Sequence, residues 1–427
     1  MTKYKLGDLC RIASSKRIFE SEYVDQGIPF IRGQEISDGS ILDPKASFEC
    51  YISQSRYEEI KEKYGKPTKG DILITAVGTI GNLCYLDKDI DFYFKDGNVI
   101  WFSEIISSCE GKFLFHFMKS SFFKDQLKYF MIGAVQKALT IDMLKKVEVP
   151  LPPLSEQKKI ASVLSALDDK IALNKKMNQK LEAMAKRLYD YWFVQFDFPD
   201  KNGRPYKTTG GPMTYNPTLK REIPEGWDVA PISEFIEKNF NGEWGKEEAS
   251  EDDIRVHCVR GADIVDMVDM PVRYISTKKK DRILNPNDII VEISGGSPTQ
   301  STGRATFVTR NTLNRFDSPM TCSNFCQIIR LKDAKCASYF FEMWQKFYAS
   351  DIFFNFEGKT SGIKNFQTDS FIATPWAHPP KELMYKFDEM YQSFMKKKER
   401  LIAENQKLTA LRDKLLPLLM NGQVVVG

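Results

Sequence analysis

The sequence predicts an α+β protein with an internal repeat. Two similar globular units are each followed by a long α-helix, and the two helices pair as an antiparallel coiled coil. Three observations predict this architecture: a segment that recurs in the second half, a double proline that ends each unit, and an apolar heptad pattern behind each double proline. The 427 residues suffice for two or three domains, and the 42% hydrophobic and 28% charged residues are typical of globular proteins.

The repeat is clearest between residues 178–184 and 405–411, a shift of 227 positions (405 − 178). The same shift carries Pro152-Pro153 onto Pro379-Pro380. Looser echoes at drifting shifts join Arg32-Gly33 to Arg260-Gly261, Tyr51-Ile52-Ser53 to Tyr274-Ile275-Ser276, and Asp71-Ile72-Leu73 to Asp288-Ile289-Ile290. We therefore expect globular units at 1–152 and 227–379, long helices at 153–196 and 380–427, and a crossover rich in Pro and Gly at 197–226.

Each long helix carries an apolar seam with the 3.5-residue period of a coiled coil. The asparagines Asn178 and Asn405 interrupt the seam at equivalent positions, and such a residue fixes the pairing register. A helix over residues 155–193 would be about 58 Å long at ~1.5 Å per residue, enough to act as a spacer. The alternative is that each helix only packs on its own unit. The predicted seam comprises Ile160, Leu164, Leu167, Ile171, Asn178, Leu181 and Leu188 in the first helix and Phe394, Leu401, Asn405, Leu408 and Leu415 in the second, with Lys398 and Arg412 as polar interruptions.

An aromatic-rich stretch, residues 189–196, ends the first long helix. Its aromatic density exceeds what one face of a helix can bury. The stretch therefore either closes a core or meets a partner subunit, and the sequence leaves both alternatives open.

Residues 70–82 predict a buried strand followed by a tight glycine loop, and more strand follows at residues 84–94. A phosphate-binding glycine loop needs a helix directly after it, so a nucleotide site is not expected here. Gly358-Lys359-Thr360 ends like a Walker A motif, but Phe353 occupies the position of the required upstream glycine.

The sequence offers no recognisable catalytic or metal-binding set. The eight cysteines form no Cys-x-x-Cys pair, and only three histidines are present, so zinc is not expected. Neither a Ser-His-acid motif nor an Asn-Pro-Pro-aromatic motif occurs, and we predict a protein that is not an enzyme and has no cofactor of its own. The N-terminus lacks an apolar signal core, which predicts a cytoplasmic location.

Polar and basic residues gather in the predicted loops of both units. The net charge of +4 is too small to argue for a polyanionic partner, so a basic surface must be local. Arg, Gln and Asn can read base edges, while Lys, Ser and Thr mostly contact phosphates. The candidate DNA-binding residues are Lys16, Arg17, Arg32, Gln34, Arg56, Thr75, Thr79, Asn82, Gln136 and Lys137 in the first unit and Arg260, Lys278, Lys280, Arg282, Ser297, Thr299, Gln300, Arg304, Lys359, Thr360 and Lys364 in the second.

Over nearly its whole length the sequence resembles the specificity subunits of type I restriction-modification systems. The resemblance rests on three features in this order: residues 70–81, then Gln136-Lys137 with residues 149–157 (Val-Pro-Leu-Pro-Pro-Leu-Ser-Glu-Gln), then the long helix. All three recur in looser form in the second half. There the Glu-Gln pair after the prolines is replaced by Leu383 and Met384.

The resemblance implies that each globular unit is a target recognition domain that reads one half of a split, asymmetric double-stranded DNA sequence. It implies that the helices set the gap between the halves and dock two modification subunits, which methylate adenine with S-adenosylmethionine. Restriction subunits, which have translocase and nuclease activity and use ATP and magnesium, would join the complex.

Two other functions remain open at this point. The first is a stand-alone DNA-binding regulator or adaptor that uses the same two heads without methylation partners. The second is an enzyme in its own right, such as a metal-dependent nuclease, which the lack of a catalytic set disfavours.

Overall fold

The computed structural model of the chain describes residues 2–43, 46–131, 138–265, 267–295, 297, 299–360 and 363–424. The chain divides into two compact units, unit 1 (Met1–Ala172 with Lys407–Gly427) and unit 2 (Leu173–Gln406). Each unit holds one globular part and a stretch of both long helices, α7 (Leu154–Tyr189) and α11 (Lys381–Met420). The predicted α+β repeat is confirmed.

The central sheet of unit 1 has the strand order β2-β9-β6-β7 and is antiparallel throughout. Alternation along β6 turns Ile72 and Ile74 toward the helices and Leu73 toward the opposite face, because successive side chains of a strand point to opposite sides. The central strands are β2 (Arg11–Ala13), β6 (Ile72–Thr75), β7 (Leu83–Tyr85) and β9 (Val99–Ser103). The other elements are β1 (Thr2–Lys5), α1 (Leu6–Leu9), β3 (Tyr23–Val24), β4 (Ile28–Ile31), α2 (Gly33–Ser37), β5 (Tyr51–Ile52), α3 (Gln54–Tyr64), β8 (Tyr93–Phe94), α4 (Gly111–Lys119), α5 (Ser121–Met131), α6 (Ile141–Lys145) and β10 (Glu148–Leu151).

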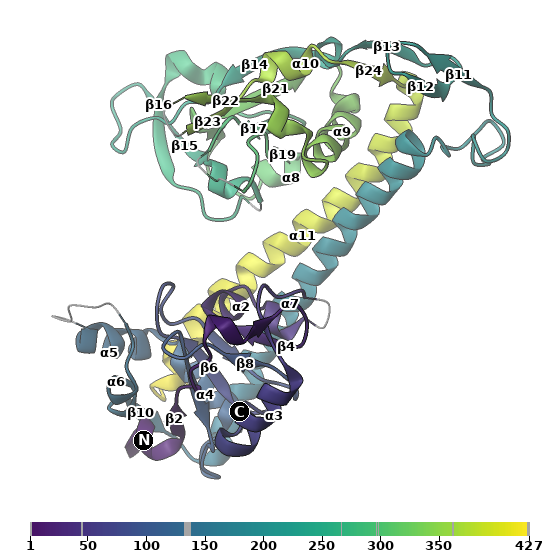
Figure 1. The fold of residues 1–427 in the computed structure, drawn as a ribbon. Coiled ribbons are helices and arrows are strands. Elements are labelled where there is room, and N and C mark those ends of the chain that lie inside the picture. Colours follow the sequence, from purple (N-terminus) through teal and green to yellow (C-terminus); the bar gives the residue numbers. More distant parts are fainter. Residues whose placement is uncertain are drawn as a thin grey trace. The chain divides into compact units, whose positions relative to one another are not determined.

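Unit 2 repeats this sheet as β14-β21-β17-β19, again antiparallel throughout (Figure 1). Ile289 and Val291 of β17 face the helices and Ile290 faces away, as in β6. The strands are β11 (Met213–Asn216), β12 (Arg221–Pro224), β13 (Asp228–Pro231), β14 (Ile236–Asn241), β15 (Asp253–Val259), β16 (Val272–Ser276), β17 (Ile289–Glu292), β18 (Ser294–Gly295), β19 (Ala305–Phe307), β20 (Met320–Cys322), β21 (Cys326–Leu331), β22 (Glu357–Thr360), β23 (Ile363–Phe366) and β24 (Pro375–His378). Its helices besides α7 and α11 are α8 (Arg310–Leu313), α9 (Ala337–Ala349) and α10 (Thr368–Ile372).

Each globular part is closed by pairing its first strand with its last. In unit 1 β1 pairs with β10, with Thr2 opposite Leu151. In unit 2 β13 pairs with β24, with Asp228 opposite His378. The last strand of each pair leads directly into the double proline and then into a long helix, so the two copies share their topology as well as their sequence pattern.

The long helices pair antiparallel within each unit. In unit 1 Asp168 of α7 meets Arg412 of α11, with 2.9 Å between carboxylate and guanidinium. In unit 2 Glu182 lies 2.6 Å from Lys398, and the Tyr189 and Phe387 rings are 6.1 Å apart. Residue numbers that rise along α7 and fall along α11 establish the antiparallel direction. None of the helices in the described part of the chain is long and apolar enough to cross a membrane.

The seam differs from the prediction at two kinds of position. Lys398 and Arg412 do not weaken the helix pair, since both form ion pairs across it. In α11 Met395 is buried and Phe394 only half-buried, because this part of the helix also packs on the globular part of unit 2. Of the predicted seam residues, Ile160, Leu164, Ile171 and Leu181 are buried and Leu167, Asn178, Leu188, Phe394, Leu401, Asn405, Leu408 and Leu415 are half-buried.

The aromatic stretch after α7 closes a core. A π-helical turn, Asp190–Val194, follows Tyr189 and turns Trp192 and Phe193 inward, where Phe193 contacts Tyr339 with ring centroids 4.7 Å apart. Tyr191 remains 38% exposed. The predicted crossover contains the hairpin β11–β12, whose Ile223 lies in the same core.

The Glu-Gln pair after the first double proline has a structural role at Gln157. This fully buried amide accepts the Glu110 N–H at 2.8 Å and donates to the carbonyls of Ser108 and Pro152 at 3.0 and 2.8 Å. Met384, its counterpart in the second copy, packs in the apolar core of unit 2 instead. The first turn of α7 is therefore anchored by hydrogen bonds, whereas the first turn of α11 is anchored by apolar packing.

Candidate nucleic-acid interface

A glycine loop after the central strand is the first part of the candidate interface in unit 1. The Gly81 N–H donates to the Thr75 carbonyl at 2.9 Å, and the Thr75 N–H donates to the Asn82 carbonyl at 2.9 Å. Gly81 has a φ of +92°, a conformation that side chains rarely adopt. These bonds turn the loop back on itself and leave Thr79 exposed.

Unit 2 closes its loop in the same way. Gly303 donates to the Glu292 carbonyl and Glu292 donates to the Arg304 carbonyl, both at 2.8 Å, and Gly303 has a φ of +94°. The loop in unit 1 spans residues 76–82, whereas the loop in unit 2 spans residues 293–304 and carries extra hydroxyl and amide side chains. Similar stems thus hold loops of different length and chemistry.

An Arg-Gly turn lies against the stem of each loop. The Arg32 N–H donates to the Glu35 carboxylate at 2.8 Å, and the Arg260 N–H donates to the Asp263 carboxylate at 2.9 Å. A Cβ on Gly261 would lie 2.5 Å from the Glu292 carboxylate, so only glycine permits this approach.

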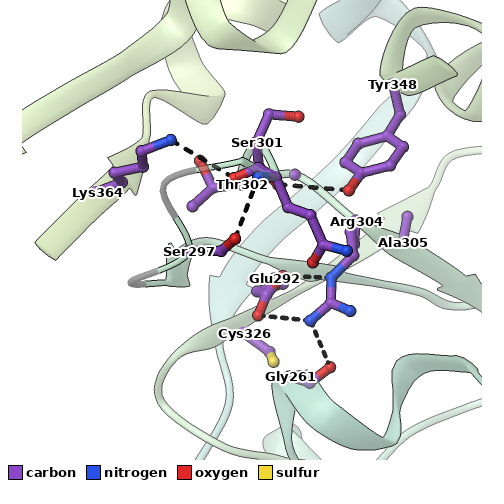
Figure 2. A network of polar contacts seen from close by, with 12 residues as sticks. Gly261, Glu292, Ser297, Ser301, Thr302, Arg304, Ala305, Cys326, Tyr348 and Lys364 are labelled. Atoms are coloured by element: carbon purple, nitrogen blue, oxygen red, sulfur yellow. Dashed lines mark hydrogen bonds and ion pairs between the residues drawn. The ribbon is translucent and has the colours of Figure 1, made fainter. Parts of the chain in front are cut away.

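Arg304 is the centre of a polar network in unit 2, which Figure 2 shows. Its guanidinium makes two hydrogen bonds to Glu292, at 2.7 and 3.0 Å, and a third to the Gly261 carbonyl at 3.1 Å. The hydrogen bonds to Glu292 raise the pKa of Arg304 above its ordinary value. Such a bidentate pair makes Arg304 a brace between the loop and the Arg-Gly turn.

A second network joins the loop to the hairpin β22–β23. β18 pairs with β23, with Ser294 opposite Asn365 and Gly295 opposite Lys364. The Lys364 ammonium lies 3.1 Å from the Glu357 carboxylate and 3.5 Å from the Gln300 carbonyl. The structure therefore brings Lys364 to the loop that carries Ser297, Thr299, Gln300 and Arg304.

Most predicted arginines are engaged within the chain. Arg17 pairs with Asp96 at 3.1 Å, Arg56 with Glu22 at 2.8 Å, and Arg32 with Glu49. Arg260 pairs with Asp263 at 2.8 Å and Arg282 with Asp281 at 3.3 Å. Arginines held in this way orient neighbouring loops, and DNA contact by them requires exchange of an internal partner for a phosphate or base.

The prediction for Thr75 needs correction, while that for Asn82 stays a prediction. Thr75 is 1% exposed, and its hydroxyl donates to the Thr79 carbonyl and accepts the Asn82 N–H, so it shapes the loop and is not available to DNA. The Asn82 amide donates to the Ser37 hydroxyl at 2.6 Å.

The remaining predicted residues fall into three groups. Lys278 and Lys280 are exposed, and no ion pair forms between either of them and another part of the chain that the structure describes. In the second group the Lys16 ammonium lies 5.5 Å from the Tyr64 ring, and Gln34 is exposed on α2. A third group cannot be placed: Gln136 and Lys137 lie outside the described residues, and so do the side chains of Lys359 and Thr360, whose backbone ends β22.

The acidic partners, above all Glu292, Glu357 and Asp263, are not among the residues that the sequence predicted. A signal for one of them was present, since the Arg-Gly echo extends to Glu35-Ile36 and Asp263-Ile264 in the two copies. Glu357 had no such signal, because its partners are brought to it only by the fold. Within the described residues, no group of three or more His, Cys, Asp or Glu side chains could hold a metal ion.

Comparison with known proteins agrees with this geometry. Residues 1–183 match the family described as type I restriction modification DNA specificity domain. The Methanocaldococcus jannaschii type I restriction enzyme MjaIX specificity subunit is 27% identical over 453 aligned residues, covering 100% of this chain and 97% of that protein. Over its full length the chain is similar to type I restriction-modification specificity subunits.

Two further relatives support the assignment of this specificity subunit. The M. jannaschii MjaVIII specificity subunit is 28% identical over 193 residues, 43% of each chain. The crystal structure of the type I restriction-modification S subunit from M. genitalium has the same fold, with a TM-score of 0.53 at 14% identity over 98% of this chain and 95% of that one. Each of these relatives is the specificity subunit of its own system.

Proposed function

We propose that this specificity subunit reads a bipartite, asymmetric DNA sequence, with one half recognised by each globular part. The observation that carries the proposal is the pair of equivalent glycine loops. Their stems close by the same backbone hydrogen bonds, while residues 76–82 and 293–304 differ in length and in polar side chains. Two loops that have the same stems but different polar side chains favour recognition of two different half-sites.

We further propose that α7 and α11 set the unread gap between the half-sites. The ion pairs Asp168–Arg412 and Glu182–Lys398 fix the register of the two helices. A single register gives a single gap length. If one helix slid along the other by one turn, the spacing between the half-sites would change by about 5.4 Å.

The methylation and restriction chemistry is proposed to belong to partner subunits. Two modification subunits would bind S-adenosylmethionine and methylate adenine within the site that this subunit selects. Restriction subunits that use ATP and magnesium would cleave DNA that lacks the mark. The present chain would contribute DNA recognition and the surfaces on which these subunits assemble.

Mapping of methylated adenine in host DNA tests the proposal. The genome is sequenced for N6-methyladenine with this gene intact, deleted and restored, beside its neighbouring methyltransferase gene. We expect methylation of one split sequence to vanish on deletion and to return on restoration. Methylation that is unchanged by deletion would reject the proposal and favour a stand-alone DNA-binding regulator.

A further inference from the structure

Hydrogen bonds hold both the N–H and the carbonyl of Gln300, while its side chain is exposed and can bind a ligand. The Gln300 N–H donates to the Ser297 hydroxyl at 3.1 Å, and its carbonyl lies 3.5 Å from the Lys364 ammonium. Gln300 is exposed, and among the described residues its amide group makes no hydrogen bond. A glutamine amide carries a donor and an acceptor side by side, the pair that matches the N7 and N6 edge of adenine in the major groove.

A buried carboxylate fixes the residues that follow Gln300. One oxygen of Glu357 accepts the Thr302 N–H at 2.7 Å and the Thr302 hydroxyl at 3.1 Å. The other lies 3.1 Å from the Lys364 ammonium, and the Glu357 side chain is only 4% exposed. Every partner of this carboxylate is therefore part of the loop or of the lysine that contacts the loop.

Aromatic side chains pack closely against the end of the loop that contains Gly303. Gly303 lies so close to the Phe353 ring that a Cβ would be 2.6 Å from a ring carbon, and its carbonyl accepts the Trp344 indole N–H at 2.8 Å. The Lys364 ammonium also lies 4.9 Å from the centre of the Phe354 ring. A reading side chain on a backbone fixed in this way loses little conformational entropy when it binds a base.

The loop of unit 1 offers no such amide. Asn82, which follows the equivalent glycine, is half-buried and already bonded to Ser37. The shorter loop there has no counterpart of Gln300. An exposed, unengaged amide on a braced backbone is thus a property of the loop in unit 2.

We propose that Gln300 reads an adenine in the half-site of unit 2 and that Glu357 is the positioning residue that holds it. This inference rests on the proposed function and deepens it, because it names a specificity-determining side chain. The sequence predicted Lys364 as a phosphate contact. We assign it instead to holding the loop in place, through its ion pair with Glu357.

The first test replaces Gln300 in the complete complex with its modification subunits. Gln300→Ala is compared with Asn202→Ala, an exposed amide in the same unit outside the loop. We expect the methylated motif to become degenerate at one adenine position of one half-site, with roughly 5- to 150-fold loss of discrimination there. The other half-site and the gap should be unchanged, and an unaltered motif would overturn the proposal.

The second test separates positioning from general stability. We expect Glu357→Gln to relax the same base position as Gln300→Ala, and the double variant to discriminate no worse than Gln300→Ala alone, because both act through one contact. Lys364→Arg keeps the charge and should retain the wild-type motif. A Glu357→Gln protein that melts at a lower temperature but keeps its full base preference would reject the positioning role.

The outcome also separates this inference from the function on which it rests. If the wild-type complex methylates no split sequence, the proposed function itself fails. If it does so and Gln300→Ala leaves that motif intact, only the assignment of Gln300 fails.

Discussion

The side-chain amide of Asn174 on α7 donates a 2.9 Å hydrogen bond to the side-chain carbonyl of Asn405 on α11. The repeat shift makes Leu401 the counterpart of Asn174 and Asn405 the counterpart of Asn178. Leu401 cannot form the second asparagine pair of a symmetric seam, and among the described residues the buried Asn178 side-chain oxygen has no hydrogen-bond partner. The sequence indicated Asn178 as a register residue, whereas the contact belongs to Asn174.

This asymmetry predicts opposite effects for two similar substitutions. Asn178→Leu should stabilise the protein by about 1 kcal/mol, because it removes an unsatisfied buried oxygen and adds apolar surface to the seam. Asn174→Leu should destabilise it by about 1–3 kcal/mol, because Asn405 loses its donor. Denaturant unfolding of the two variants checks both signs, and equal effects would contradict the assignment.

A charged network in unit 1 predicts a large effect at Asp168. Its carboxylate lies 2.8 Å from the Lys119 ammonium and 2.9 Å from the Arg412 guanidinium, and it is 21% exposed. Asp168→Asn should lower the free energy of unfolding by about 2–3 kcal/mol, because two partly buried cations lose their shared anion.

The matched control for Asp168 is Asp413. It also pairs with Arg412, at 2.8 Å, but its side chain is 59% exposed. Asp413→Asn should change stability by less than about 0.5 kcal/mol, since exposed pairs contribute little. Thermal unfolding of the two variants in parallel makes the comparison, and equal losses would mean that the network does not depend on burial.

Two buried titratable groups, one in each unit, predict opposite responses to pH. Burial lowers the pKa of His116 in α4 from 6.5 to about 4, and burial raises the pKa of Glu342 in α9 from 4.5 to about 8. The unfolded chain protonates His116 first, so unit 1 should lose stability as the pH falls from about 6.5 to about 4. The folded chain keeps the proton of Glu342, so unit 2 should lose stability as the pH rises from about 4.5 to about 8.

Two neutral substitutions separate these contributions. His116→Gln should flatten the acid side of the curve of unfolding free energy against pH, and Glu342→Gln should flatten the alkaline side. Denaturant unfolding of wild type and both variants between pH 4 and 9 provides the curves. A His116→Gln protein with the wild-type acid limb would show that another group controls it.

The exposed lysines of unit 2 predict a salt-dependent effect on DNA binding. If Lys278 and Lys280 contact phosphates, removal of both by alanine substitution should reduce the slope of log affinity against log salt by up to ~1.8, from ~0.9 per phosphate contact. The affinity loss should be similar for specific and unrelated DNA. Lys332→Ala serves as the control, because this lysine already pairs with Glu234 at 3.4 Å.

The amino-acid sequence by itself determined the repeat, the order of globular parts and helices, the glycine loops and the family resemblance. These features depend on residues that are close together in the chain, or on a period of 3.5 residues or an alternation of two, which a sequence displays directly. The grouping of Ser297, Thr299, Gln300 and Arg304 on one loop was likewise accessible, because these residues are neighbours in sequence.

Only the tertiary structure decided what each polar side chain does. Glu357 meets Thr302, Gln157 meets Ser108, and Asn174 meets Asn405, each across a long separation in sequence. A hydrogen bond or ion pair of about 3 Å depends on the positions of both backbones, which no local pattern encodes. For the same physical reason the sequence identified arginines as suitable for DNA but could not reveal that Arg260 and Arg304 are held by carboxylates of their own unit.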